Sequence, residues 1–194
     1  MKRVLFYAIL IVTGLVGCTE DKTNTVTESQ LNQMRSTSME FMKELKGILI
    51  NEIQQSGVLS AVAVCSDTAQ LLTNNFGIQR GVFVKRVSFN NRNEDNFPDE
   101  YEKQILNKFL EMHKNSKLTE TSENIEIIFE DELKYLRYLK PIFIQAECLN
   151  CHGSETDIQQ ETKKLIAEKY PNDKAINYKL GDLRGAVSVK KVIE

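Results

Sequence analysis

The residues with the clearest capacity for chemistry form one short motif, Cys148-Leu149-Asn150-Cys151-His152. Two thiols separated by two residues can meet the two vinyl groups of one porphyrin, and the adjacent imidazole can reach its iron as the proximal ligand. The motif therefore predicts one covalently attached c-type haem, with thioethers at Cys148 and Cys151 and with His152 on the iron.

Two other uses of the paired cysteines compete with haem. A tetrahedral zinc site needs four ligands, and elsewhere the chain offers only Cys65 and His113, without a second Cys-x-x-Cys. The adjacent Cys151 and His152 are also awkward as ligands of one tetrahedral ion. A redox-active thiol pair is typical of a βαβ context, which the pattern of this chain does not indicate. Haem is the preferred interpretation.

The N-terminus has the pattern of a lipoprotein signal peptide. Lys2 and Arg3 precede an apolar run too short to span a bilayer comfortably, and the run ends in Leu15-Val16-Gly17-Cys18. This ending resembles the bacterial lipobox, in which the cysteine is acylated and becomes the new N-terminus. We expect a signal peptide at 1–17 and a lipidated flexible tether at 18–29. The alternatives are an ordinary signal peptide with a chance cysteine, or an uncleaved anchor helix.

Length and charge indicate that the rest of the chain is one globular domain that does not bind nucleic acid. Of 194 residues, 41% are hydrophobic, enough for one packed core, which we assign to a single domain at 30–194. The formal charge of −2 becomes more negative when Lys2 and Arg3 are removed, which excludes the basic surface that nucleic acid requires. Lipidation and cytochrome c assembly both indicate the periplasmic side of a bacterial membrane, and we expect the outer membrane.

Hydrophobic periodicity indicates an α+β fold. Three- and four-residue steps predict helices over 31–55 and 58–72, separated by Gly57. Further helices and alternating strands are predicted, in chain order, over 81–89 (strand), 99–112 (helix), 125–129 and 134–144 (strands), 156–170 (helix) and 185–189 (strand). Helices followed by strands with helical insertions favour an antiparallel sheet.

The residues leave the second axial ligand of the iron open. Cys65 is the thiol that remains after the lipid and the two thioethers are assigned, but its stretch also has the pattern of a core helix, where a free cysteine is usually packing. Small residues four positions away on both sides, Ala61 and Ala69, would let a flat porphyrin approach it. His113 lies in a polar stretch typical of an exposed side chain. The methionines of the first helix are more often core than ligand: Met34, Met39 and Met42.

Several patches between about Met39 and Val189 carry a family resemblance. They are Ala63-Val64-Cys65, Arg86-Val87-Ser88, Arg92-Asn93, the motif through Gly153, Tyr170-Pro171, and the stretch from Gly181 to Val189. In these patches the chain is similar to the haem-binding PAS-like domains, long described as a domain of unknown function. The resemblance implies a PAS-like antiparallel sheet with a long N-terminal helix and flanking helices. It also implies axial ligation by His152 and Cys65.

Two positions depart from the family pattern, and two arginines gain a role from it. Glu94 stands where the family has proline, and Asn177 stands where it has glycine; asparagine tolerates a positive φ, so the turn can survive. Arg86 and Arg92 become candidates for an ion pair with a haem propionate, because arginine makes bidentate contacts with carboxylates. Otherwise they form a solvated strand edge and loop.

These features favour a role without catalytic turnover. We expect redox or gas-ligand sensing through a partner protein, because a thiolate ligand favours ferric iron and its release on reduction would open a position for a diatomic gas. The chain has no output module of its own. The alternative is a low-potential electron-transfer cytochrome. We do not expect an enzyme such as a peroxidase, since two axial ligands leave no free position on the iron and no distal His-Arg pair is visible.

Overall fold

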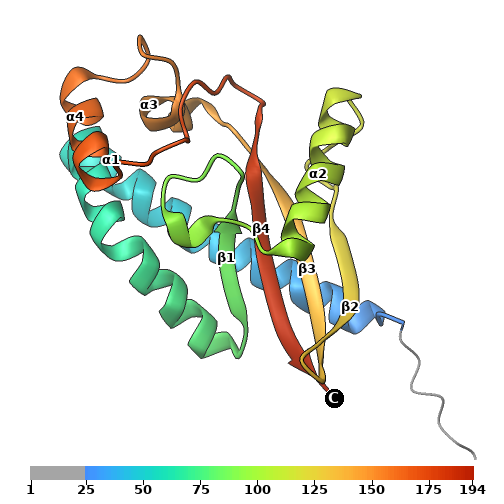
Figure 1. Cartoon of the computed structure of the whole chain (residues 1–194). Helices are drawn as coiled ribbons and strands as arrows, with labels where there is room; N and C mark the ends of the chain where they lie inside the picture. Colours follow the sequence, from blue (N-terminus) through green and yellow to red (C-terminus); the bar gives the residue numbers. More distant parts are fainter. Residues whose placement is uncertain (1–24) are drawn as a thin grey trace, which may run out of the picture.

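The computed structural model describes residues 25–194, so the predicted signal peptide, Cys18 and most of the tether lie outside the described residues. One antiparallel sheet, in the order β1-β4-β3-β2, carries helices on both faces (Figure 1). The elements are α1 (Glu28–Arg80), β1 (Phe83–Val87), η1 (Glu94–Asn96), α2 (Glu100–Lys114), β2 (Asn124–Glu130), β3 (Leu133–Phe143), η2 (Ala146–Cys148), α3 (Leu149–His152), α4 (Gln160–Lys169) and β4 (Leu183–Ile193). The predicted α+β class is confirmed.

The long helix α1 is two helices joined at Gly57, as the sequence predicts. The backbone of Gly57 has φ 85° and ψ 173°, a conformation that only glycine adopts freely. The hydroxyl of Ser60 donates a hydrogen bond to the Glu52 carboxylate across this break, at 2.7 Å. The two halves then lie side by side, with the rings of Phe41 and Phe76 5.3 Å apart. The chain thus forms a helical hairpin on one face of the sheet (Figure 1).

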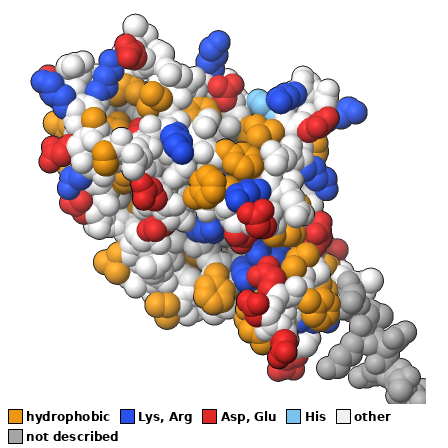
Figure 2. Space-filling model, viewed as in Figure 1, with side chains coloured by type: hydrophobic (Ala, Val, Ile, Leu, Met, Phe, Trp, Pro, Cys, Tyr) orange, Lys and Arg blue, Asp and Glu red, His pale blue; other side chains and the backbone are white. Residues whose placement is uncertain are grey.

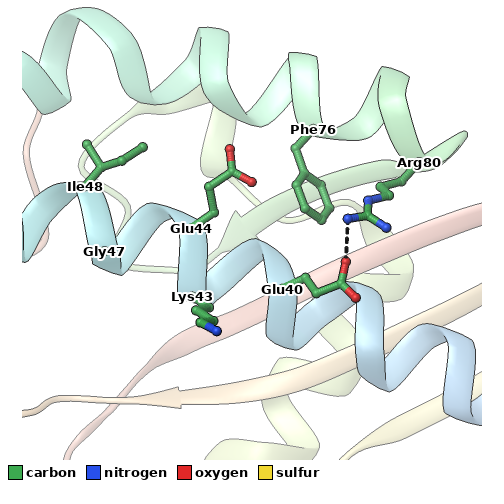
Figure 3. Close-up of a pocket in the computed structure, with 7 residues that line it drawn as sticks. All are labelled: Glu40, Lys43, Glu44, Gly47, Ile48, Phe76 and Arg80. Carbon is green, nitrogen blue, oxygen red and sulfur yellow. Dashed lines mark ion pairs between the residues drawn. The ribbon is translucent and has the colours of Figure 1, made fainter.

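An open groove separates the two halves of this hairpin, as Figure 3 shows. Ile48 and Phe76 face it, and an ion pair of 2.7 Å between Arg80 and Glu40 closes it at one end. Among residues 25–194, α1 alone has the length and composition that could cross a membrane, a test that core helices also pass. Because α1 is interrupted at Gly57 and packs on the sheet, it is not one continuous span.

Two hydrophobic clusters join the helices to the two faces of the sheet. The cluster under α1 consists of Met34, Phe41, Phe76, Leu136, Tyr138, Val187 and Val189. The cluster under α2 consists of Val87, Ile105, Leu106, Phe109, Leu118, Leu139, Leu183 and Ala186. Near α2 the guanidinium of Arg137, 1% exposed, also pairs with Asp99 at 2.7 Å and Glu130 at 2.6 Å.

On the face in Figure 2, hydrophobic side chains lie among charges of both signs.

Some boundaries differ from the predicted ones for identifiable reasons. The second half of α1 continues beyond residue 72 to Arg80, because Thr73, Phe76 and Gly77 are buried. The helix begins at Glu28, inside the predicted tether, where Thr27 caps it. The helix predicted from residue 156 begins at Gln160, since the backbone N–H and the hydroxyl of Ser154 donate to the Asp157 carboxylate and fold the preceding residues into a turn. Strand β4 spans 183–193 instead of 185–189, because it pairs along most of β3.

Candidate functional site

The Cys-x-x-Cys-His motif lies in a compact turn directly after β3. Cys148 ends η2, and Cys151 and His152 belong to α3. Both cysteines of the motif are free and half-buried. An ion pair of 2.7 Å between Lys46 and Glu147 joins this turn to the first half of α1. The motif is thus held against the helical hairpin, with both thiols available for covalent chemistry.

The ring of His152 is fixed by a hydrogen bond to the backbone. Its Nδ1 lies 2.7 Å from the carbonyl oxygen of Ala175, so Nδ1–H donates and Nε2 keeps its lone pair. The backbone N–H of Tyr178 donates to the His152 carbonyl at 2.9 Å, and the Tyr178 ring stands edge-on to the imidazole. Burial, together with the positive charges of Arg92 and Arg184, lowers the pKa of His152 well below its usual value. Both effects favour the neutral imidazole, which is the form that binds a metal.

The residue after this histidine must be glycine for steric reasons. A Cβ on Gly153 would lie 2.7 Å from the carbonyl oxygen of Leu149 and 2.7 Å from the carboxylate of Asp157. The next segment also closes on Gly153, because the N–H of Asn177 donates to its carbonyl at 2.8 Å. Asn177 has φ 65°, a positive value that asparagine tolerates, so the turn expected at this position is present.

Cys65, on the second half of α1, lies beside the haem-attachment motif. Its thiol is half-buried, and burial raises its pKa, while the nearby guanidinium of Arg86 opposes this shift. Cys65 also lies close enough to Cys151 to contribute to the raised pKa of that thiol, of which burial is the larger cause. Two residues further along the helix, Asp67 pairs with Lys169 of α4 at 3.0 Å. The structure therefore brings Cys65 together with the motif, although Cys65 and Cys148 are 83 positions apart in the chain.

The two arginines singled out from the sequence have different surroundings. Arg86, on β1, lies near Cys65 and Tyr170, and its guanidinium makes no hydrogen bond or ion pair with any residue in 25–194. Arg92 binds protein groups instead, with hydrogen bonds to the carbonyl of Cys151 and to the carboxylate of Asp173. That one of the two contacts a propionate stays a prediction; Arg86 has more unused donors.

The other candidate ligands lie elsewhere. His113, on α2, packs its ring against Phe143 at 6.1 Å between centroids. Met34 is fully buried in the cluster under α1, Met42 packs against that cluster, and Met39 is 59% exposed. Within residues 25–194, no three His, Cys, Asp or Glu side chains gather as a zinc site would require. Of the residues considered from the sequence, Cys65 is the one that the fold places beside the motif.

Comparisons with known proteins show the family and the fold of the chain. The model of the Tll0287-like family matches residues 19–191, nearly the whole chain. The chain belongs to the Tll0287-like family. Its fold is similar to that in a crystal structure of the cyanobacterial haem protein Tll0287, with a TM-score of 0.64 and 23% identity over 87% of this chain and 98% of that one. No curated protein matches the chain.

Some residues around His152 had no role assigned from the sequence. Ala175 acts through its backbone carbonyl, which no side-chain pattern reveals. Arg184 donates to the carbonyl of Asn90 at 3.0 Å, and its guanidinium lies 5.4 Å from the centre of the Tyr178 ring. The available signal was that Arg184 falls in the stretch from Gly181 to Val189 that carried the family resemblance, which did not indicate what each residue does.

Proposed function

We propose that this protein binds one haem c covalently through Cys148 and Cys151. The observation that carries the proposal is the set of groups that the fold gathers at one place. Two free thiols stand beside an imidazole whose Nδ1–H is already bonded to a carbonyl. This is the arrangement in which Nε2 of His152 is presented as a metal ligand. Membership of the Tll0287-like family, and the similarity of the fold to that of a cyanobacterial haem protein, support the same proposal.

Cys65 is the proposed second axial ligand. Its half-buried thiol, on a helix that packs against α3, lies near both Cys151 and the positive charge of Arg86. Ala69, four residues along on the same side of the helix, is half-buried and small enough to let a flat ring approach, whereas Ala61 is already buried by protein. Arg86, with its donors unused by the protein, is our candidate to bind a propionate carboxylate.

We further propose a sensing role without catalytic turnover. Haem with a thiolate ligand supplies one-electron chemistry at low potential, because an anionic donor stabilises ferric iron. Cys65 is positioned on a helical hairpin that ion pairs join to the haem-attachment turn and to α4. Loss of Cys65 from the iron on reduction would free a coordination position for a diatomic gas. It would also release the hairpin from the iron, and a partner protein would then recognise the changed position of the hairpin.

The lipid anchor at Cys18 and the periplasmic location are part of this proposal. The sequence pattern of the first eighteen residues supports them. A tether of about ten residues reaches roughly 30–35 Å when extended, so the haem domain would stay close to its membrane. The second candidate function is a membrane-moored electron carrier, which the same low potential favours.

A redox titration under different gases separates the two functions. The purified protein is reduced electrochemically, with absorption spectra recorded under argon, carbon monoxide and nitric oxide. Sensing predicts loss of the thiolate signature on reduction and uptake of either gas. Rapid, reversible cycling with spectra that neither gas alters would overturn the sensing role in favour of electron transfer.

A further inference from the structure

The guanidinium of Arg92 joins the haem-attachment turn to the segment that follows α4. Its Nη2 donates to the carbonyl of Cys151 at 2.6 Å and to the carbonyl of Ala175 at 3.2 Å. Its Nε donates to the carboxylate of Asp173 at 3.1 Å. The side chains of Arg92 and Asp173 are only 13% and 9% exposed, so these are shielded, charge-assisted bonds.

The carbonyl of Ala175 is also the group that holds the histidine. It accepts from Nδ1–H of His152 at 2.7 Å, and Ala175 itself is fully buried. The N–H of Ala175 donates to the second carboxylate oxygen of Asp173 at 2.8 Å. The bonds therefore form a closed ring that runs from Arg92 through Asp173, Ala175 and His152 to Cys151 and back to Arg92.

We propose that Arg92 is a positioning residue for His152. It fixes the distance between the carbonyl before the histidine, on Cys151, and the carbonyl on Ala175 that orients the imidazole. This inference rests on the proposed function, in which Nε2 of His152 binds iron. A strong, well-aligned Nδ1–H···O=C bond raises the basicity of the ligand and stabilises ferric iron. Arg92 would thus keep the reduction potential low by orienting His152, and not through the effect of its positive charge on the iron.

The shape of the arginine side chain gives this proposal its test. A planar guanidinium reaches two carbonyls and one carboxylate at once, whereas the ammonium of lysine is a point charge on a flexible stem. Arg92→Lys keeps the positive charge near the haem but cannot maintain all three contacts. If Arg92 acts by charge alone, on a propionate or on the iron, lysine should substitute for it.

The experiment compares Arg92→Lys with a matched control, Arg35→Lys. Nε of Arg35 also donates to both carboxylate oxygens of one residue, Glu123, at 2.9 and 3.0 Å. Arg35 lies near the start of α1 and Glu123 lies just before β2, so neither belongs to the haem-attachment turn. Covalent haem content is measured first, followed by reduction potential, the electron paramagnetic resonance spectrum and the solvent exchange rate of the His152 Nδ1 proton. Absence of covalent haem in the parent protein would contradict the proposed function, and not this inference.

The expected results differ between the two variants. Arg92→Lys should raise the reduction potential, broaden the resonance signal and speed exchange of the Nδ1 proton by about tenfold, the effect of weakening one buried hydrogen bond. Arg35→Lys should lower thermal stability and leave all three readouts as in the parent. If Arg92→Lys matches the parent in potential and exchange, the proposal is wrong.

A second variant covers the case in which Arg92→Lys does not fold or does not acquire haem. Asp173→Asn keeps Arg92 and retains an oxygen for the Ala175 N–H, but removes the charge that aligns the guanidinium. We expect faster exchange of the His152 Nδ1 proton than in the parent. Exchange at the parental rate in Asp173→Asn would likewise overturn the proposal.

Discussion

The carbonyl oxygen of Ala175 lies 2.7 Å from Nδ1 of His152, although 23 residues separate them in the chain. This bond fixes the tautomer in which Nε2 faces away from the backbone with its lone pair free. It joins the attachment motif to the segment between α4 and β4, so the geometry of the histidine depends on the packing of the C-terminal third of the domain.

Replacement of Cys65 tests the second axial ligand. Cys65→Ala should give a high-spin or water-ligated haem that is still covalently bound, with a higher reduction potential, because an anionic donor has been removed. Cys65→Met keeps a sulfur ligand without the charge and should also raise the potential. Absorption and electron paramagnetic resonance spectra are the measurements. If Cys65 is only core packing, Cys65→Ala costs about 1 kcal/mol of stability and leaves the spectra unchanged.

The lipid anchor is tested by Cys18→Ala. The variant should acquire haem normally and move from the membrane fraction to the soluble fraction, because the acyl chains are lost while the haem domain is unaltered. Cell fractionation followed by haem staining measures this. An unchanged membrane fraction would mean that the apolar N-terminal run is an uncleaved anchor, or that a partner holds the protein.

The break in α1 depends on one glycine, and a second glycine offers a control. Gly57→Ala should lower the free energy of unfolding by about 1–3 kcal/mol, because φ 85° with ψ 173° is strained for any side chain. Gly47→Ala should raise it by about 0.5–1 kcal/mol, since Gly47 is inside a helix and a Cβ there meets nothing within 4 Å. Denaturant unfolding of both variants measures the difference. Equal effects would show that the Gly57 conformation carries no constraint.

Acid sensitivity should come partly from Glu123. The hydrogen bond from Arg35 is the largest cause of the lowered pKa of this carboxylate, and the hydroxyl of Tyr138 also donates to it, at 2.9 Å. The stabilisation is fully present above the ordinary glutamate pKa, about 4.3, and is lost as pH falls through the lower folded-state value. Glu123→Gln should therefore flatten the decline in unfolding free energy between about pH 5 and pH 2.

A surface variant serves as the reference for this pH profile. Glu120 has an exposed side chain that forms no ion pair among residues 25–194. Glu120→Gln removes a carboxylate without removing an ion pair, so its slope of unfolding free energy against pH is the reference for that of Glu123→Gln. A slope in Glu123→Gln equal to this reference would place the acid sensitivity in other carboxylates.

The sequence predicted the parts of the site that depend on residue type and spacing. The pair of thiols with an adjacent imidazole is local, and so is the glycine that divides α1. The approach of Cys65 to the motif depends on the hairpin and the sheet, so periodicity alone left Cys65 as core packing until the family resemblance was considered. The bonds of Arg92 to two carbonyls could not be foreseen, because backbone acceptors leave no mark in the sequence.

Covalent attachment of haem at Cys148 and Cys151 is the central claim, and extraction tests it most directly. The purified mature protein is treated with acidified acetone, and the pyridine haemochrome of the polypeptide fraction is recorded. We expect the haem to stay with the polypeptide and to give the haemochrome spectrum of two thioethers. In the double variant Cys148→Ser/Cys151→Ser, we expect both results to be lost. Extractable haem, or stoichiometric zinc in place of haem, would contradict the account.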